Sequence, residues 1–430
     1  MTTYTCERCF KVFNQKGHFS RHMQKKIPCV DNGEHLKNLI DVAVSEKIDE
    51  LTKSPIKKKL VRVSKLPIKN ISETLNKDKN QPKIQRLNYI GSKFQLIDWL
   101  VNIMKEKTGW ESFSNKRVAD LFAGTGVVSY YMRNNNAKVQ SNDAELYSSI
   151  ITHAFTRSTY TDMCKSTITQ LQKELTDNKH LDTSGFVTVH YSPYNDNERK
   201  FFTVENAKRI DYIRNRLEQL KSTMTADEYV FVLASIIISA DAVSNVPAVY
   251  GCFLKQFKAK ALKNLTITPI HTLTLQASED SITYNKDVLD DNLLDDIEAD
   301  LVYLDPPYNQ RQYSKNYFPL NIIAKTPEEL TTEPQLKGKT GIPVDCFVSP
   351  FCKKGKIVEE AFDKLFNGLK TKWIFLSYNS ESIVSKEKML EIMGKYGVAS
   401  VVERDYKRFK SFEYNNDVDI KEYLFCLHKN

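Results

Sequence analysis

Hydrophobic positions along the chain change their spacing, and each spacing predicts a different element. Short apolar runs within 116–126, 298–308 and 372–379 end at Gly, Asp or Asn, as buried strands do where they meet a turn. Stretches with helical spacing lie between them, for example 92–107 and 361–372. Strands that alternate with helices indicate an α/β fold with a largely parallel sheet, and such sheets bind ligands at the carboxyl ends of their strands.

The alternation is interrupted over residues 165–295. This stretch contains an amphipathic run at 201–220 and then a run at 227–246 that is apolar enough for a core helix. We therefore predict one ligand-binding α/β domain that is formed by residues 84–164 and 296–430, with a mainly helical insertion between its two parts.

The first 83 residues have a different composition. Residues 1–33 are rich in Cys and His, whereas in 34–83 Lys, Ser, Asn and Pro dominate without a sustained apolar period, which is typical of a flexible linker. The whole chain holds 62 Lys and Arg against 53 Asp and Glu, a net charge of +9, and much of the excess lies near the N-terminus. A basic segment there suits a polyanionic partner such as nucleic acid, although a solvated basic linker has the same composition.

No feature of the sequence indicates a membrane or an oxidising compartment. The apolar residues, 41% of the total, never form an uninterrupted run near the ~20 needed to cross a bilayer. Residues 1–10 lack the basic and then apolar pattern of a signal peptide, and the eight cysteines are too sparse for a secreted disulfide framework. We expect a soluble intracellular protein, in the cytoplasm or the nucleus, with no membrane partner.

Gly124 and Gly126 stand between a predicted strand and a predicted helix. Glycine lets a nucleoside ligand approach the main chain closely and the helix start offers free N–H groups, although a tight strand-to-helix turn would also explain both. Asp143 follows the next strand, where an acid can bind ribose hydroxyls or cap a helix. Ser129 stands where the dinucleotide fingerprint has its third glycine, so a nucleoside without a pyrophosphate fits better.

Residues 305–308, Asp-Pro-Pro-Tyr, follow the apolar run 301–304 and resemble motif IV of the adenine-N6 DNA methyltransferases. The run 87–96 resembles the N-terminal S-adenosylmethionine (AdoMet) motif of that family, and 120–126 resembles its AdoMet-binding glycine loop. Their order, with a long insertion before the acidic motif, is that of the alpha group, the Dam-like D12 class. The resemblance extends over residues 86–430.

The resemblance implies a Rossmann-like, AdoMet-dependent methyltransferase domain in which the insertion recognises the target. It implies S-adenosylmethionine as the cofactor and double-stranded DNA as a partner, and a restriction endonuclease for the same site is a further candidate partner. The residues that it assigns to AdoMet binding are Tyr89, Lys93, Asp120, Phe122, Gly124, Gly126, Asp143 and Asp305. The residues that it assigns to catalysis are Asp305, Pro306, Pro307 and Tyr308.

The residue types of this motif suit the chemistry of adenine N6, whose lone pair is delocalised into the ring. The Asp305 carboxylate and the Pro306 carbonyl can each accept one N6 hydrogen, which favours a tetrahedral nitrogen whose lone pair points at the methyl donor. The prolines stiffen the turn, and Tyr308 supplies an aromatic face for an adenine that has left the duplex. An N-capping turn with a packed tyrosine is the structural alternative.

We therefore predict a site-specific enzyme that methylates a flipped-out adenine in a short duplex motif. Enzymes that make N4-methylcytosine usually carry Ser at the position of Asp305, and glutamine or RNA methyltransferases of the superfamily tend to carry Asn, so the aspartate favours adenine in DNA. A DNA-binding zinc-finger protein that retains an inactive methyltransferase fold, and an RNA adenine methyltransferase, are the alternative functions.

Residues outside the motifs supply candidate DNA contacts. Asn245 and Tyr250 in the insertion are candidates for contact with the flipped base or the groove. Four lysines are candidates for phosphate contacts or for a solvated helix face: Lys255, Lys258, Lys260 and Lys263. Residues 311–317 resemble a subgroup of type II restriction-associated adenine methyltransferases, and 406–408 are expected on a loop near the pocket.

The N-terminal segment, 1–33, resembles a ββα zinc finger of the C2HC type. Tyr4, Phe13 and Phe19 occupy the positions of the small hydrophobic core of such a finger. The candidate metal ligands are Cys6, Cys9, His22 and Cys29. A segment of about 30 residues has too little core to fold alone, so a structural Zn²⁺ ion would supply the missing stability.

Overall fold

A computed structural model describes residues 4–6, 12–13, 15–24, 84–87, 89–272, 280–332, 335–406 and 420–430. The chain divides after Ile68 into two separate units. The predicted linker, 34–83, lies outside the described residues. None of the described helices is long and apolar enough to cross a membrane.

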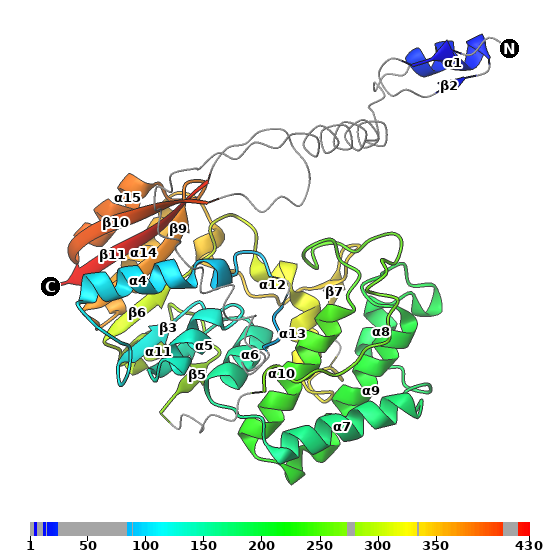
Figure 1. Cartoon of the computed structure of the whole chain (residues 1–430), viewed down its shortest axis with the longest axis horizontal. Coiled ribbons are helices and arrows are strands. Elements are labelled where there is room, and N and C mark those ends of the chain that lie inside the picture. Colours follow the sequence, from blue (N-terminus) through cyan, green and yellow to red (C-terminus); the bar gives the residue numbers. More distant parts are fainter. Residues whose placement is uncertain are drawn as a thin grey trace, which may run out of the picture. The chain divides into compact units, whose positions relative to one another are not determined.

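The N-terminal unit contains two short strands and a helix (Figure 1). β1 (Tyr4–Thr5) pairs antiparallel with β2 (Val12–Phe13), and α1 (Lys16–Met23) follows. The Phe19 ring of α1 lies 5.9 Å from the tyrosine ring of β1 and 6.0 Å from the phenylalanine ring of β2, centroid to centroid. Phe19 therefore packs against both of the other aromatic side chains.

The larger unit is built on a seven-stranded sheet with the order β10-β11-β9-β6-β3-β4-β5. All strand pairs from β9 to β5 are parallel, whereas β11 runs antiparallel to both of its neighbours. The strands are β3 (Arg117–Asp120), β4 (Lys138–Asn142), β5 (Ile282–Tyr284), β6 (Leu301–Leu304), β9 (Trp373–Asn379), β10 (Gly397–Tyr406) and β11 (Ile420–Lys429). The predicted α/β class and the largely parallel sheet are confirmed.

Helices cover both faces of the sheet, as the alternation of side chains along β6 shows. Leu301 and Tyr303 belong to a core shared with α4, whereas Val302 and Leu304 belong to a core shared with α14. All four are buried because β6 lies at the centre of the sheet. The helices that contribute to these two cores are α4 (Ile97–Thr108), α5 (Val127–Asn134), α11 (Asp291–Asp296), α14 (Lys356–Gly368) and α15 (Lys386–Gly394).

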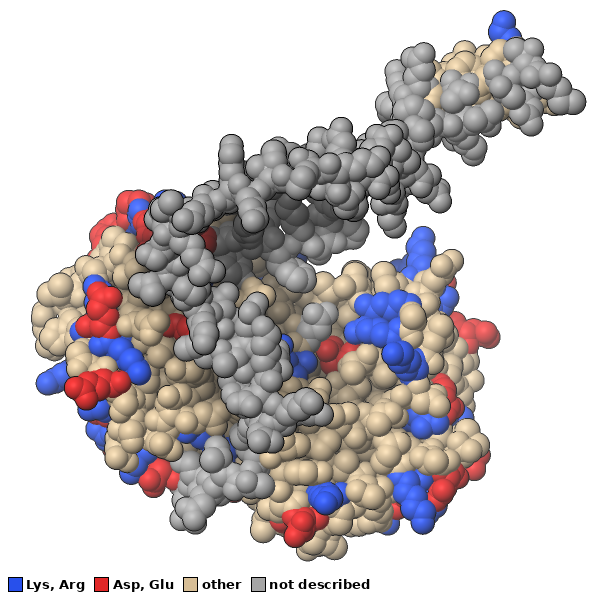
Figure 2. All heavy atoms as spheres, in the orientation of Figure 1, with Lys and Arg blue, Asp and Glu red and all other residues tan. Residues whose placement is uncertain are grey.

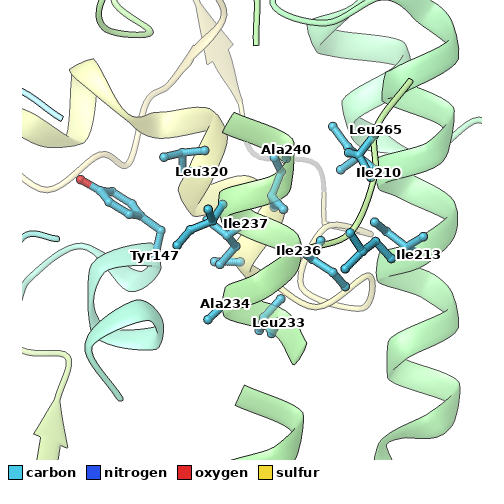
Figure 3. Close-up of a cluster of buried hydrophobic side chains, with 14 of the residues drawn as sticks. Tyr147, Ile210, Ile213, Leu233, Ala234, Ile236, Ile237, Ala240, Leu265 and Leu320 are labelled. Atoms are coloured by element: carbon cyan, nitrogen blue, oxygen red, sulfur yellow. The ribbon is translucent and has the colours of Figure 1, made fainter. Parts of the chain in front are cut away.

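A helical part of the same unit packs around α10 (Ala226–Ala242), the apolar run predicted to be a core helix. On the surface of this part, Lys and Arg side chains gather on its upper side in the view of Figure 2, whereas the surface over the sheet carries both Lys and Arg and Asp and Glu. Ile236 of α10 faces α9, and Ile237 faces α6 and α13 (Figure 3). The other helices of this part are α6 (Leu146–Thr156), α7 (Asp162–Thr176), α8 (Phe186–Tyr191), α9 (Val204–Leu220), α12 (Tyr313–Asn316) and α13 (Phe318–Ala324).

The helical part does not coincide with the predicted insertion, 165–295. β5 and α11 lie inside that range, yet β5 pairs with β4 at the sheet edge and α11 packs on the sheet. The hairpin of β7 (Leu336–Lys337) and β8 (Ile342–Pro343) comes after the Asp-Pro-Pro-Tyr turn but contacts α8, because the Tyr191 hydroxyl donates to the Gly341 carbonyl at 3.1 Å. The three residues of β5 are too few to show a period in the sequence.

Candidate active site

The carboxyl ends of β3, β4 and β6 meet at one cavity of about 1530 Å³. Asp120 ends β3, Asp143 follows β4 and Asp305 follows β6, and all three line the cavity. Residues 89–96 form another wall. Parallel strands bring their carboxyl ends to one edge of a sheet, so the topology assembles these acids from distant parts of the sequence.

Asp305 forms a buried ion pair with Lys93. The Lys93 Nζ lies 2.7 Å from the Asp305 Oδ2, and the two side chains are 17% (Asp305) and 5% (Lys93) exposed. The same ammonium donates to the Gly91 carbonyl at 2.9 Å. Burial raises the pKa of Asp305, and the charge of Lys93 opposes that rise. Lys93 therefore favours the ionised form of Asp305, which is a hydrogen-bond acceptor.

The Tyr308 ring stands beside this ion pair. It makes an edge contact with the Tyr378 ring, with centroids 5.1 Å apart. The Lys93 Nζ lies 4.9 Å from the centroid of the Tyr308 ring. The Ile383 amide donates to the Tyr308 carbonyl at 3.1 Å, which fixes the backbone as well. Tyr308 lines the cavity together with Pro306 and Pro307. The structure thus brings the four predicted catalytic residues to the same wall.

Gly124 and Gly126 adopt left-handed backbone conformations, with φ of 54° and 71°. A Cβ atom at Gly124 would lie 3.3 Å from the Tyr89 ring, so both conformation and space favour glycine there. The Gly124 amide donates to the Asp143 carboxylate at 2.7 Å, and the Ser148 hydroxyl donates to the Gly124 carbonyl at 2.6 Å. The glycine loop is therefore held through both of its polar backbone groups.

Asp143 accepts hydrogen bonds from two backbone amides. Its Oδ2 binds the amide of Gly124, and its Oδ1 binds the amide of Glu145 at 2.9 Å. Helix α6 begins after Glu145, so Asp143 is not its N-cap residue. Each carboxylate oxygen keeps a second lone pair, and contact with a ribose hydroxyl therefore stays a prediction.

The two carboxylate oxygens of Asp120 differ in their hydrogen bonding. Its Oδ2 accepts from the Ser129 amide at 3.2 Å and from the Ser129 hydroxyl at 2.7 Å. Its Oδ1 is buried and lacks a partner among the described residues. Burial raises the pKa of Asp120 to about 7, and the charge of Asp305 adds to that rise. An unmet acceptor on a cavity wall, beside Phe122, fits a cationic or N–H donor group of a ligand.

Comparison with known proteins identifies the family of the chain that forms this cavity. Residues 89–392 match the family model described as D12 class N6 adenine-specific DNA methyltransferase. The chain belongs to this family. It is 37% identical over 345 residues to Type II methyltransferase M.CviAII of Paramecium bursaria Chlorella virus 1, with coverage of 80% of this chain and 99% of the relative. It is 36% identical over 349 residues to Type II methyltransferase M.NlaIII of Neisseria lactamica, with the same two coverages.

Four acids of the methyltransferase cavity were not predicted from the sequence: Glu145, Asp287, Glu381 and Glu422. Glu422 on β11 lies opposite Asn379 on β9 and is 8% exposed. Burial raises the pKa of Glu422 to about 7 against the opposing charge of Lys93. Glu145 also lines the cavity, and burial next to Asp143 raises its pKa to about 8. The available signal for Glu422 was an acid that directly precedes the apolar run 423–427.

An aromatic stack positions Tyr89 of the methyltransferase. The Tyr89 ring lies 4.7 Å from the Tyr317 ring and 5.5 Å from the Tyr313 ring. The Ile90 amide donates to the Tyr317 hydroxyl at 2.9 Å. Tyr313 and Tyr317 come from the segment that resembles the type II subgroup, and they join residues 89–96 of the cavity wall to the chain that follows the Asp-Pro-Pro-Tyr turn.

The structure contradicts the prediction that Asn245 and Tyr250 reach the base or the groove. Both side chains are buried, at 0% and 1% exposure. The Asn245 side-chain amide donates to the carbonyls of Lys200 and Leu254, at 3.0 and 3.1 Å. The Tyr250 hydroxyl donates to the Asp241 carboxylate at 2.7 Å. The two residues stabilise the loop after α10 because these buried groups find their partners within the methyltransferase.

The four lysines of this loop divide into two pairs. Lys255 and Lys263 are exposed. The ammonium groups of Lys258 and Lys260 are partly buried and donate to backbone carbonyls. Phosphate contact is therefore a simpler expectation for the first pair than for the second. Of the late loop at 406–408, the last two residues lie outside the described part of the chain.

The candidate metal ligands of the N-terminal unit are only partly described. Cys6 and His22 belong to the described residues, whereas Cys9 and Cys29 do not. The Cys6 Sγ lies 3.7 Å from the Met23 Sδ. Within the described parts of the chain, no group of three or more His, Cys, Asp or Glu side chains could hold a metal ion. The zinc site therefore stays a prediction.

Proposed function

We propose that this chain is an AdoMet-dependent, site-specific enzyme that methylates adenine N6 in double-stranded DNA. One observation carries the proposal: Asp305, paired with Lys93, stands beside Tyr308 at the end of the central strand, in the cavity that the glycine loop also lines. The family model and the relatives named as type II methyltransferases support this activity. On the same basis we assign the protein to restriction-modification, with a restriction endonuclease of the same specificity as a candidate partner.

The cavity residues fit S-adenosylmethionine, a nucleoside with a cationic sulfonium and an amino group. The Oδ1 of Asp120, which has no partner among the residues that the structure describes, suits the amino group, and the left-handed loop at Gly124 suits close approach of the ligand to the main chain. When bound, the cofactor supplies an electrophilic methyl group. The residues that would hold it are Tyr89, Lys93, Asp120, Phe122, Gly124, Gly126, Asp143 and Asp305.

Asp305 and Pro306 act on the amino group of the target adenine. The carboxylate and the carbonyl each accept one N6 hydrogen, which concentrates the lone pair on the nitrogen. An ionised carboxylate accepts stronger hydrogen bonds than a neutral acid, so Lys93 enlarges the population of the competent form. Pro307 restricts the backbone that follows the Pro306 carbonyl, and this restriction helps to hold the carbonyl in one orientation.

Tyr308 gives the target adenine a surface on which to stack. The base must leave the duplex before it can reach the cavity, and this step costs a few kcal/mol. Stacking on an aromatic ring returns ~1–3 kcal/mol per base. Tyr378 and Lys93 both contact the Tyr308 ring, so the surface is ordered before the base arrives.

Two further parts of the chain have proposed roles in DNA binding. The helical part recognises the target sequence, and its exposed Lys255 and Lys263 meet phosphates. The N-terminal unit, which precedes the basic segment 34–83, binds Zn²⁺, and the proposed ligands are Cys6, Cys9, His22 and Cys29. The order of strand, strand and helix and the aromatic contacts of Phe19 support a finger there. Native mass spectrometry with and without a chelator measures its zinc content.

Sequencing of DNA from cells that express the protein tests the proposed activity. Sequencing that detects modified bases should find N6-methyladenine at one short motif, and mass spectrometry of digested DNA should identify the base. N4-methylcytosine as the product would contradict the assignment, as would methylation of RNA that unlabelled duplex DNA does not compete away. Binding of S-adenosylmethionine without methyl transfer to any substrate would indicate an inactive fold.

A further inference from the structure

The loop after β8, residues 344–348, carries exposed apolar side chains beside the cavity. Val344 is 50% exposed and Val348 is 48% exposed. Phe347 and Ser349, the neighbours of Val348 in the sequence, both line the cavity. A single exposed valine on a protein surface is ordinary. Two within five residues, next to a cavity that is proposed to receive a base, suggest a contact with the substrate.

Buried hydrogen bonds tie this loop to the segment after the catalytic turn. The Gln312 side chain donates to the Ser349 carbonyl at 3.1 Å and accepts from the Ser349 amide at 2.8 Å. The Ser314 hydroxyl donates to the Phe347 carbonyl at 2.6 Å. Gln312 and Ser314 are 9% and 2% exposed. The backbone on both sides of Val348 is therefore held, because its displacement would leave buried polar groups unpaired.

The hairpin that leads into the loop is supported from the helical part. The Arg199 side chain donates to the Lys339 carbonyl at 3.1 Å. The Tyr191 hydroxyl donates to the Gly341 carbonyl at the same distance. The Val344 amide itself donates to the hairpin carbonyl of Gln335 at 2.8 Å. Both ends of the loop are thus anchored, and its valines stand on a supported backbone.

We propose that Val348, assisted by Val344, enters the DNA base stack and fills the space that the target adenine leaves when it turns into the cavity. Apolar side chains that insert between base steps stabilise unstacked DNA in this manner. The partner is duplex DNA, because such a space exists only where a stacked and paired base has been extruded. This inference rests on the proposed adenine methyltransferase activity.

The substitution Val348→Ala tests the role on two substrates. One is a duplex that carries the motif found by sequencing, and the other is the same duplex with an abasic site opposite the target adenine. Val348→Ala should lower kcat/KM on the paired duplex about tenfold and change it less than about twofold on the second duplex, whose target base is already unpaired. The matched control is Val398→Ala, since Val398 on β10 is 71% exposed and does not line the cavity.

A fluorescent base measures extrusion independently of methyl transfer. With 2-aminopurine in place of the target adenine, the rise in fluorescence on binding should be smaller for Val348→Ala than for the wild type and the control variant. Equal losses of kcat/KM on both duplexes, or wild-type values on both, would overturn the role of Val348. If the wild type methylates neither duplex, the proposed activity itself fails, and this outcome differs from a loss that is confined to the variant.

Discussion

Polar residues in two regions of this methyltransferase have opposite roles. On the cavity wall, the Oδ1 of Asp120 has no partner among the described residues, and Asp305 is one of several acids that line the same cavity. In the loop after α10, Asn245 and Tyr250 bind carbonyl and carboxylate groups of the fold itself. Polar residue types occur in both regions, so residue type alone does not distinguish their roles. What separates a functional polar group from a structural one is whether it lines the cavity and keeps hydrogen-bonding capacity for a ligand.

The largest effect should come from removing an acid of the cavity. Asp305→Ala deletes an acceptor for N6 and leaves Lys93 without its counter-charge, so methyl transfer should fall by at least about 10²- to 10³-fold. Transfer of a labelled methyl group to DNA at saturating substrate measures it. Retention of more than a tenth of the activity would place the essential acceptor elsewhere.

The next effect concerns the aromatic surface of the cavity. Tyr308→Ala should lower kcat/KM by ~10- to 100-fold, because the loss of stacking is worth ~1–3 kcal/mol. Tyr308→Phe keeps the ring and should retain most of the activity in the same assay. Equal losses in the two variants would show that the hydroxyl, rather than the face of the ring, is required.

A substitution in the loop after α10 should change the free energy of unfolding and leave kcat unchanged. Asn245→Ala leaves the buried carbonyls of Lys200 and Leu254 without a donor, so the free energy of unfolding should fall by ~1–3 kcal/mol. Urea denaturation measures this change. The folded variant should keep its kcat, and a specific loss of kcat at unchanged stability would return Asn245 to the substrate-binding surface.

The raised pKa of Glu422 predicts a dependence of stability on pH. Burial raises this pKa from 4.5 to about 7, so the folded protein keeps the proton while the unfolded chain loses it. Glu422 does not destabilise the folded protein below about pH 4.5, where both states keep the proton. Between about pH 4.5 and pH 7 it lowers the free energy of unfolding progressively. Glu422→Gln should reduce the difference in unfolding free energy between pH 5 and pH 8, by ~1–3 kcal/mol. An unchanged difference would show that Glu422 is ionised in the folded protein throughout this range.

Removal of residues 1–80 should have the smallest effect on catalysis in the cavity. The truncated enzyme should keep its kcat and its target motif, because every residue proposed for catalysis lies after this segment, while DNA affinity falls and bound zinc is lost. Kinetics at saturating DNA and metal analysis measure these quantities. A folded truncated protein that cannot methylate, or that changes its motif, would assign the N-terminal unit to the active site or to target recognition.

The cavity could be predicted from the sequence more completely than its surroundings. Asp120, Asp143 and Asp305 stand where strands end, and a parallel sheet brings such positions together whatever the length of chain between them. Glu422 lies instead near the start of an antiparallel strand, where the rule of carboxyl ends does not apply. β5 is too short to show alternation, so the end of the helical insertion was predicted too late.

The loop after α10 shows a different limit of sequence analysis. Asn245 looks like a candidate for base recognition because its amide can both donate and accept. Its burial depends on Lys200 and on Leu254, which come before and after the end of α10. Local sequence contains no information on such contacts, so a polar residue in a loop cannot be assigned to the surface without the fold.

The position of β6 also bears on the order of events during synthesis of the protein. β6 pairs with β3 on one side and β9 on the other, and β11, which carries Glu422, pairs behind β9. Contacts between segments so far apart in sequence form slowly, whereas α9 and α10 are consecutive along the chain. The helices can therefore pack while the ribosome is still adding the strands that complete the cavity. A nascent chain would therefore begin to build its proposed surface for reading DNA before it acquires the capacity to mark it.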